Sequence, residues 1–400
     1  MSKWEEKRLE DIIDVNPPVK LKKGESYPFI DIDKVSPTRR SVTNEEVKVY
    51  NGQSSSKFCD GDTVFSRITP CLENRKIAKV AIEGDAAFGS TEFYVFRAKK
   101  KKADARFTYY LTSSDAVVLP AINSMTGASG RQRADKRFIQ RLKLNLPDLP
   151  TQERIADILS AYDDLIEVNN RRIELLEQAA QELYKEWFVR FRFPGYENAK
   201  FEDGIPEGWE QDKIQKYYNT CSGGTPSRSK PEYFENGVYP WVKTGEIKDC
   251  VIIDTEEYIT QEAVNNSSAK VLPAKSVAMA MYGVNIGLLA YFDSEMTCNQ
   301  ACCVFSDKRD FSSKHYLYYY LKSIREYLLL ISFGAAQQNL SQDLIKKIKI
   351  TMPSDDVVQA FEKQVDDIYD NIRMLLLRNK NLAEQRDMLL PRLMSGKLEV

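Results

Sequence analysis

A helix-forming segment of this chain occurs twice, and the second copy begins 206 residues after the first. In each copy, core positions recur at alternating steps of three and four residues, starting at Ile155 in the first copy and at Phe361 in the second. Such steps average about 3.5 residues, the period that lets one helix present a continuous seam to another. We therefore predict two coiled-coil helices of about four to five heptads each, which pair with each other within one chain.

The predicted pairing residues occupy the core positions of these heptads. In the first copy they are Ile155, Leu159, Tyr162, Ile166, Asn169, Ile173, Leu176 and Leu183, with Ala180 and Trp187 in the same run. In the second copy they are Phe361, Val365, Ile368, Ile372, Leu375, Asn379, Leu382 and Leu389, with Arg386 and Leu393 in the same run.

We expect the two helices to run antiparallel, because a globular domain of roughly 150 residues lies between them and leaves an easy return path. With Ile155 opposite Leu393, the side chains of Asn169 and Asn379 would meet. A polar layer of this kind fixes the register of a coiled coil at some cost in stability. Alternatively, each asparagine is solvated at a locally open layer.

Mixed, strand-like sequence precedes each helix, and each such stretch opens with a tryptophan at a matching place, Trp4 and Trp209. A repeat of this length exceeds the roughly 20 to 50 residue periods of solenoids and propellers, so it indicates two duplicated domains. We predict an α+β fold with two mixed α/β domains, two long antiparallel coiled-coil helices and a pseudo-twofold internal repeat. The predicted parts are domain 1 at 1–150, helix 1 at 151–192, a linker rich in Pro and Gly at 193–205, domain 2 at 206–352, and helix 2 with the tail at 353–400.

Charge is distributed unevenly although the net charge is only −1. Residues 1–150 carry 27 Lys and Arg against 20 Asp and Glu, whereas residues 151–205 carry 7 against 12 and residues 206–352 carry 16 against 17. A basic first domain suits a polyanion such as DNA, and acidic helices suit a protein partner. A surplus of this size is also compatible with an ordinary solvated surface.

Composition predicts a soluble, cytoplasmic protein that does not enter a membrane. The seven cysteines lack paired C-x-x-C spacing, which favours reduced thiols over a disulfide framework or structural zinc, and we expect Cys298, Cys302 and Cys303 to be small buried groups. The longest uncharged run, 276–292, is interrupted by glycines and is shorter than the roughly 20 apolar residues of a membrane helix. The charged first residues do not resemble a signal peptide.

Motifs for catalysis are absent from the sequence, which predicts a binding protein that is not an enzyme. The single histidine, His315, lies in an aromatic helical run and is interpreted as a packing or surface residue. Asn16-Pro17-Pro18-Val19 is similar to the motif with which adenine methyltransferases hold a flipped base, but Val19 replaces the stacking aromatic, so we interpret it as a turn. The sequence also lacks a P-loop motif and the methyl-donor loop, and we expect no cofactor and no metal in this chain.

Several segments together resemble the specificity subunit of Type I restriction-modification systems, and the resemblance covers the whole chain. Ser222-Gly223-Gly224-Thr225-Pro226-Ser227 with Tyr239-Pro240-Trp241-Val242 is similar to the start of that family's target recognition domain. Leu146-Pro147-Asp148-Leu149-Pro150-Thr151-Gln152-Glu153-Arg154 is similar to the start of its conserved helix. The second helix lacks that Pro-Thr-Gln-Glu-Arg start, and the first domain lacks the Gly-Gly-Thr-Pro-Ser turn.

The resemblance implies a division of labour between this chain and its partners. Each recognition domain would read one half of a split target in double-stranded DNA, and the helices would set the spacer and dock two modification (methyltransferase) subunits. Restriction subunits would join for cleavage. Adenine-N6 methylation and endonuclease activity, together with S-adenosylmethionine, ATP and Mg²⁺, would belong to those partner subunits. The acidic helices, with Arg386 at a core position, suggest that another subunit completes part of the seam.

Candidate DNA-contacting residues follow the predicted strands, because base edges are read by Arg, Asn, Gln, Ser and Thr on loops that can enter a groove. Matching clusters in the two halves strengthen this interpretation. The alternative is that these glycine turns and amides only cap the adjoining strands and helices. The candidates in domain 1 are Arg67, Thr69, Ser90, Thr91, Ser129, Arg131, Gln132 and Arg133, and in domain 2 they are Thr225, Ser227, Arg228, Lys243, Tyr282, Asn285, Asn299, Gln300, Gln337, Gln338 and Asn339.

Two other classes of function make different predictions. A coiled-coil scaffold or interaction protein with two globular ends would bind DNA, if at all, without sequence preference and with a steep salt dependence. A sequence reader keeps a large ratio of specific to non-specific affinity at moderate salt. A methyltransferase in its own right would bind the methyl donor as an isolated chain, which the absent glycine-rich loop disfavours.

Overall fold

The computed structural model describes residues 4–44, 46–128, 130–332 and 339–400, and the chain divides into two compact units. Unit 1 comprises Met1–Val168 and Asn379–Val400, and unit 2 comprises Asn169–Arg378. The boundary falls inside both long helices, α5 (Leu149–Tyr184) and α11 (Asp355–Met394), so each helix contributes a part to each unit.

The two predicted long helices are confirmed. The carboxylate of Asp148 accepts a hydrogen bond from the N–H of Thr151 at 3.2 Å, which satisfies a donor at the start of α5. Asp355 and Asp356 lie in the first turn of α11, where negative charge is stabilised by the helix dipole. A π-helical segment, η1 (Lys185–Val189), extends α5 and ends the first helix three residues before the predicted boundary.

Within unit 1, the beginning of α5 packs against the end of α11, which makes this part of the pair antiparallel. Ile155 and Leu159 share one core with Leu393, and Leu389 packs against it. Within unit 2, the end of α5 packs against the beginning of α11 in the same sense. The shared core there contains Ile173, Ala180, Trp187, Phe361, Val365, Ile372 and Leu375, with Leu176, Leu183 and Ile368 packed against it.

The heptad prediction is less complete away from these cores. Tyr162, Ile166 and Leu382 are only half-buried. Near the end of α5 the buried face also includes Tyr184, which follows the predicted Leu183 and lies one helical turn after the buried Ala180. Asn169 and Asn379 belong to different units, so their meeting stays a prediction.

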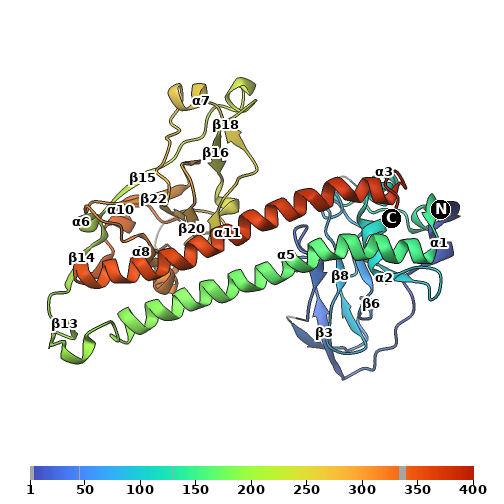
Figure 1. Ribbon diagram of the computed structural model, residues 1–400, viewed down its shortest axis with the longest axis horizontal. Helices are drawn as coiled ribbons and strands as arrows, with labels where there is room; N and C mark the ends of the chain where they lie inside the picture. The colour runs from blue at the N-terminus through green and yellow to red at the C-terminus, as the bar shows by residue number, and fades with distance from the viewer. Residues whose placement is uncertain (1–3, 45, 129, 333–338) are drawn as a thin grey trace. The chain divides into compact units, whose positions relative to one another are not determined.

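Unit 1 contains two main sheets (Figure 1), with β1 (Trp4–Arg8) pairing separately with β11 (Lys143–Pro147). The five-stranded sheet has the order β2-β10-β7-β8-β4, and the four-stranded sheet has the order β5-β3-β9-β6. The strands are β2 (Ile13–Val15), β3 (Ser26–Ile30), β4 (Ser41–Val42), β5 (Val47–Val49), β6 (Ser56–Phe58), β7 (Thr63–Ser66), β8 (Ile77–Val80), β9 (Ala87–Gly89) and β10 (Phe93–Ala98). Helices α1 (Leu9–Ile12), α2 (Ala105–Ser113), α3 (Asp115–Asn123) and α4 (Lys136–Gln140) complete the domain.

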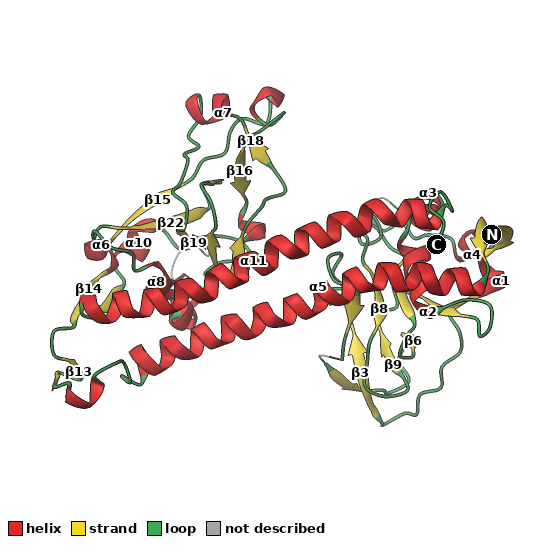
Figure 2. Ribbon diagram, in the orientation of Figure 1, coloured by secondary structure: helices red, strands yellow, loops and turns green. Residues whose placement is uncertain are grey.

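Unit 2 repeats this plan (Figure 2), with β14 (Glu210–Lys213) pairing separately with β23 (Lys349–Met352). Its five-stranded sheet has the order β15-β22-β19-β20-β17, and a second sheet has the order β18-β16-β21. The strands are β15 (Tyr218–Ser222), β16 (Tyr239–Val242), β17 (Cys250–Ile252), β18 (Tyr258–Ile259), β19 (Val277–Ala280), β20 (Leu289–Phe292), β21 (Thr297–Cys298) and β22 (Cys302–Asp307). The helices are α6 (Ile214–Tyr217), α7 (Gln261–Asn265), α8 (Lys314–Ser323), α9 (Arg325–Ser332) and α10 (Gln342–Lys346), with short 3-10 turns η3 (Pro231–Tyr233) and η4 (Thr244–Glu246).

Strand directions repeat as well as strand order. In the five-stranded sheets, the edge pair β4–β8 and its counterpart β17–β20 are parallel, and the other pairs are antiparallel. In the second sheets, β3–β9 and β16–β21 are the corresponding parallel pairs. The central strands β7 and β19 are buried along their whole length, which anchors the loops that follow them. The predicted α+β internal repeat is therefore present.

The linker forms local structure of its own. A 3-10 turn, η2 (Tyr196–Asn198), is followed by a hairpin of β12 (Phe201–Glu202) and β13 (Ile205–Pro206). Phe193 is buried, with its ring centroid 5.2 Å from that of Trp209. As expected, Cys298, Cys302 and Cys303 are buried free thiols. No helix among the described residues is long and apolar enough to cross a membrane.

Candidate nucleic-acid interface

Three of the predicted segments of domain 1 converge at one end of the five-stranded sheet. The N–H of Arg67, directly after β7, donates to the carbonyl of Glu92 at 2.9 Å, and the N–H of Ala134 donates to the carbonyl of Arg67 at 2.8 Å. Thr69 and Gln132 exchange two hydrogen bonds, one of which uses the Thr69 hydroxyl as acceptor at 3.0 Å. The segments 67–69, 90–92 and 131–134 thus form one surface, defined here as the domain 1 loop surface.

Glu92 joins two predicted DNA-contacting arginines on the domain 1 loop surface. Its carboxylate accepts from Nε of Arg133 at 2.9 Å and from a terminal nitrogen of the same guanidinium at 2.5 Å. Nε of Arg67 donates to the same carboxylate at 3.2 Å. These arginines, Arg133 above all, hold the pKa of Glu92 below its usual range. Sequence reasoning identified both cations and missed the anion that holds them.

The other domain 1 candidates differ in exposure. Ser90 accepts a hydrogen bond from the N–H of Glu92 at 3.3 Å, so its hydroxyl closes the turn before β10. Thr91 and Arg131 are exposed, which leaves their side chains accessible to a ligand. Ser129 lies outside the described residues.

An isolated bridge marks the equivalent surface in domain 2. Tyr282, which follows β19, pairs in antiparallel fashion with Asn339, just as Ile68, which follows β7, pairs with Arg133. The sequence predicted that the segments after these two central strands are equivalent, and the matching bridges confirm it. Tyr282 is exposed and Asn339 half-buried, while Gln337 and Gln338 lie outside the described residues.

The Gly-Gly-Thr-Pro-Ser turn places three further candidates together. A Cβ atom added at Gly223 would lie 1.9 Å from the carbonyl oxygen of Cys298, so only glycine allows the backbones to approach this closely. The hydroxyl of Thr225 in this turn donates a hydrogen bond to the side-chain oxygen of Gln300, and both residues are exposed. Asn299 turns its side-chain oxygen to the N–H of Ala301 at 3.1 Å.

Glu257 joins two predicted DNA-contacting cations of domain 2. It accepts from Arg228 at 2.5 Å and from Lys243 at 3.0 Å, and Lys243 also donates to Glu256 at 2.8 Å. The guanidinium of Arg228 lies over the rings of Phe234 and Trp241, 4.4 and 5.0 Å from their centroids. Hydrogen bonds from Arg228 and Lys243 lower the pKa of Glu257. The residues 225–228, 243, 257, 282, 299–300 and 339 are defined here as the domain 2 loop surface.

Two predicted residues are used within the protein. The amide nitrogen of Asn285 donates to the carbonyls of Thr244 and Ile247 at 2.9 and 3.1 Å. Asn285 therefore stabilises the turn η4, which directly follows Lys243. This agrees with the alternative that such amides only cap the adjoining elements. The hydroxyl of Ser227 lies 2.8 Å from that of Ser229, within an exposed turn.

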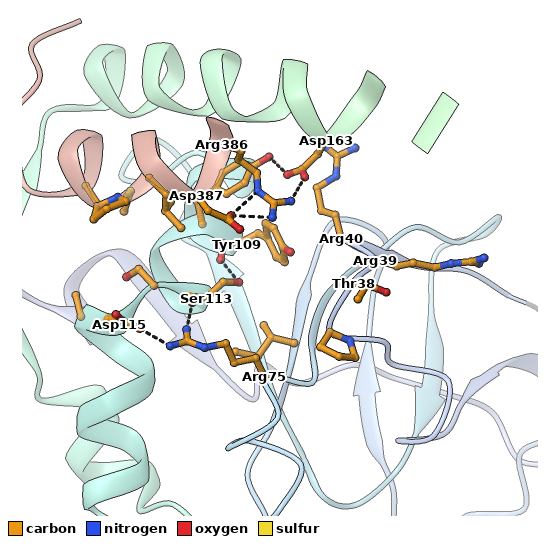
Figure 3. Close-up of a pocket in the computed structure, with 18 of the residues that line it drawn as sticks. Thr38, Arg39, Arg40, Arg75, Tyr109, Ser113, Asp115, Asp163, Arg386 and Asp387 are labelled. Carbon is orange, nitrogen blue, oxygen red and sulfur yellow. Dashed lines mark hydrogen bonds and ion pairs between the residues drawn. The ribbon is translucent and has the colours of Figure 1, made fainter. Parts of the chain in front are cut away.

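A cavity of about 470 Å³ lies elsewhere in unit 1, lined by α2 and the parts of α5 and α11 that belong to this unit (Figure 3). Three of its cations pair with carboxylates, and among them Arg386 pairs with Asp163 and Arg75 with Asp115. Arg40 donates to Asp164 and Glu167 of α5 at 2.5 and 2.9 Å. The pairs of Arg40 therefore fasten α5 to domain 1, the pair of Arg386 joins α11 to α5, and that of Arg75 lies within domain 1. For Arg386, the chain itself supplies the partner, so this guanidinium does not need another subunit.

His315 and Asn16 have the structural roles predicted for them. His315 is fully buried beside the rings of Tyr291 and Tyr369, and its burial lowers its pKa to about 4. Asn16 adopts a positive φ of 56° at the turn after β2, and its side-chain oxygen accepts from the N–H of Val95 at 2.8 Å. Within the described ranges, no three His, Cys, Asp or Glu side chains come close enough to hold a metal ion.

Comparison with known proteins gives a consistent result. A family described as "Type I restriction modification DNA specificity domain" matches residues 1–178 and 206–375. The Type I restriction enzyme HindI specificity subunit of Haemophilus influenzae is 27% identical and covers 88% of this chain and 90% of its own length. The MjaIX specificity subunit of Methanocaldococcus jannaschii is 24% identical, with 99% and 94% covered. In its fold, the chain is similar to the crystal structure of a Type I restriction-modification S subunit from M. genitalium, with a TM-score of 0.55, 14% identity, and 98% and 96% covered.

Proposed function

The chain belongs to the family of Type I restriction modification DNA specificity domains and carries two of them, and we propose that each domain reads one half of a two-part DNA target. The family confers specificity and is non-catalytic. In this proposal the recognition surfaces are the domain 1 and domain 2 loop surfaces. Both combine exposed side chains, such as Arg131 and Arg133 in domain 1 and Thr225 and Arg228 in domain 2, with half-buried polar and charged ones on the same loops.

The proposal rests chiefly on the recurrence of one loop arrangement in both domains. The bridge between Ile68 and Arg133 in domain 1 has its counterpart between Tyr282 and Asn339 in domain 2. The N–H of Ser90 donates to the carbonyl of Ile30 at 3.1 Å, and that of Asn299 donates to the carbonyl of Val242 at 3.0 Å. A duplicated scaffold with different side chains on the same loops suits two readers of different sequences.

The side chains on these surfaces have the chemistry required to read base edges. Exposed arginines such as Arg131 and Arg133 can donate two hydrogen bonds to guanine, and Gln300 can contact adenine through its amide. Lysines and hydroxyls on the same loops suit phosphate contacts, which position a protein on DNA without carrying sequence information. Recognition by two such surfaces gives a target with two specific parts and an unread gap.

The helices are proposed to set the length of that gap. α5 has 36 residues and α11 has 40. At about 1.5 Å per residue, a helix of this length spans roughly 55 to 60 Å. One turn of DNA is about 34 Å, so a rigid helix pair is long enough to hold two readers one turn apart.

The same helices are proposed to dock two modification subunits. In unit 1, Leu165 and Val168 of α5 are 53% and 56% exposed, and Met388 of α11 is 65% exposed. In unit 2, the exposed apolar residues of the helices include Leu175 and Met374. Leu165 and Val168 are three residues apart and share one helix face, where a partner helix could cover them. Restriction subunits would join this complex, in addition to the modification subunits, for cleavage.

Chemistry is proposed to reside in those partners. The complex would methylate adenine at N6 and cleave unmodified DNA, with S-adenosylmethionine on the modification subunits and ATP and Mg²⁺ on the restriction subunits. This chain would bind none of these cofactors itself. Its contribution would be to choose the DNA sequence on which the partners act.

The alternative is a scaffold that binds DNA without sequence preference, and one experiment separates the two functions. The chain is co-expressed with a modification subunit of the same system, and the purified complex methylates a randomised DNA library that is then sequenced for modified adenines. The proposal predicts a two-part motif with a fixed gap. A contiguous motif, or methylation without any motif from a complex shown to assemble, would favour the scaffold.

A further inference from the structure

In each recognition domain a single glutamate holds two of the cations expected to contact DNA. Glu92 joins Arg67 and Arg133 in domain 1, and Glu257 joins Arg228 and Lys243 in domain 2. Both carboxylates are more shielded than the arginine heads they hold: Glu92 is 20% exposed against 46% for Arg133, and Glu257 is 29% exposed against 55% for Arg228. Each arginine therefore extends further into solvent than its carboxylate.

The two glutamates do not occupy equivalent positions in the two copies of the repeat. Glu92 directly precedes β10, and the residue that precedes the equivalent strand β22 is Ala301. Glu257 instead directly precedes β18, in the second sheet. The same arrangement of one carboxylate and two cations thus arises from different elements in the two domains, which internal duplication by itself does not explain.

A carboxylate on a DNA-binding surface opposes binding, because it repels phosphates and neutralises nearby cations. It also orients the cation, because a carboxylate and a guanidinium form paired hydrogen bonds in a fixed plane. Arg133 uses Nε–H and one terminal nitrogen in its pairing with Glu92. Arg228 is held differently: one terminal nitrogen donates to Glu257, and the guanidinium lies over the rings of Phe234 and Trp241. For Arg133, this side-on pairing leaves one further N–H on the bonded terminal nitrogen and both N–H groups on the other terminal nitrogen. One N–H from each of these nitrogens together can match the O6 and N7 acceptors of guanine.

We propose that Glu92 and Glu257 are positioning residues for sequence discrimination, which hold Arg133 and Arg228 in place for a guanine in each half of the target and withhold these cations from phosphates. This inference rests on the proposed function, because it requires that the two loop surfaces contact DNA. It adds that a pair of acidic residues, one in each domain, sets the ratio of specific to non-specific binding.

The test uses Glu92→Gln and Glu257→Gln in the full chain, purified with the modification subunit. Matched controls are Glu83→Gln and Glu235→Gln, which remove the same charge at exposed positions of the same two domains. Binding to a duplex without the target is measured over a range of salt concentrations. One cation freed to bind a phosphate should raise non-specific affinity about fivefold near 0.15 M salt and steepen the plot of log K against log salt by about one unit.

Methylation of a randomised library gives the second measurement. Glu92→Gln should relax the sequence preference in one half of the motif and leave the other half unchanged, and Glu257→Gln should do the reverse. A second change, Arg133→Ala added to Glu92→Gln, should remove the gain in non-specific affinity. This double variant identifies Arg133 as the freed cation, and thermal unfolding checks that each variant remains folded.

The outcomes separate this inference from the proposed function. If the wild-type complex shows no two-part motif, the proposed function itself is contradicted. If the wild-type complex shows the motif but both glutamine variants behave like the Glu83→Gln and Glu235→Gln controls, only the role of Glu92 and Glu257 is overturned. If Arg133→Ala leaves the raised non-specific affinity of Glu92→Gln intact, the mechanism through Arg133 fails.

Discussion

Buried charged residues fix the ends of the long helices to the recognition domains. In unit 1, Asp163 is 2% exposed and accepts hydrogen bonds from Arg386 and from the hydroxyl of Tyr110, the latter at 2.5 Å. In unit 2, Glu362 is 5% exposed and accepts from the N–H groups of His315 and Tyr316 at 3.3 and 2.8 Å, at the start of α8. Removing either carboxylate leaves buried donors without their acceptor.

Asp163→Ala should lower the free energy of unfolding by about 2–3 kcal/mol. Breaking a fully buried pair costs about 3–5 kcal/mol, and the partial exposure of Arg386 reduces the expected loss. Glu153→Ala, at an exposed position of the same helix, serves as the control and should change stability by less than about 0.5 kcal/mol. Urea unfolding measures both values, and equal stability of the two variants would rule out a stabilising role for Asp163.

Glu362 should make the stability of the chain depend on pH. Burial raises its pKa from the ordinary value of 4.5 to about 8. Between these values the unfolded chain has lost the proton and the folded chain retains it, so stability should fall as pH rises from about 4.5 to 8. His315, whose pKa is lowered from 6.5 to about 4, acts in the opposite direction between pH 4 and 6.5, and Asp366 and Lys314 also face this cluster.

Glu362→Gln isolates the contribution of Glu362, because glutamine does not titrate. Unfolding of the variant and of the wild-type chain is followed from pH 5 to 9. Relative to the wild-type chain, the variant should gain free energy of unfolding as pH rises to 8. Above pH 8 the difference between the two should stay constant. A pH-independent difference would show that Glu362 is ionised throughout.

Residue identity alone could predict only part of the candidate site. The strand ends, the glycine turn and the exposed arginines follow local patterns, and these positions were predicted correctly as loops. The directions of Asn285 and Asn299 depend on which backbone groups lie nearby in the fold, and both use their side chains to hold turns. Glu92 and Glu257 were missed because their arginine and lysine partners lie 10 or more residues away in sequence.

At the scale of elements, the long helices were the most predictable part of the chain. Their seam follows from a local period, so buried positions such as Ile155, Leu159, Phe361 and Val365 could be predicted, whereas Val358 and Tyr369 of the core around Phe361 were not. The order of strands in the sheets could not be predicted, because pairs such as β2 with β10 join residues far apart in sequence. The π-helical segment at 185–189 also carries no simple sequence signal, and the burial of Tyr184 beside Leu183 was not predicted by the heptad positions.

Phe361→Ala should cost about 3–5 kcal/mol in the free energy of unfolding, as expected for removing a buried phenyl ring. Phe361 is 0% exposed, and its ring centroid lies 4.8 Å from that of Phe188 and 5.8 Å from that of Trp187. The matched change Met374→Ala, on an exposed position of the same helix, should cost less than about 0.5 kcal/mol. Comparable losses in the two variants would contradict the assignment of this core.

At the scale of the whole molecule, two domains share one strand order while differing in sequence and in surface charge. Residues 1–150 have a surplus of basic residues, and residues 206–352 are close to balance. The shared scaffold preserves the positions of the loops after β7 and β19, and the side chains on those loops differ. Such a molecule is suited to combine two independent specificities, and each domain should then be exchangeable without effect on the other.

The exchange of residues 206–352 tests the central claim most directly. This segment is replaced by the corresponding domain of a relative with a different DNA target, and the complex with the modification subunit methylates a randomised library. The account predicts that one half of the motif changes to that of the donor, while the other half and the gap between them remain. A change in both halves, or in neither, from a complex that assembles normally would contradict the assignment of one half-site to each domain.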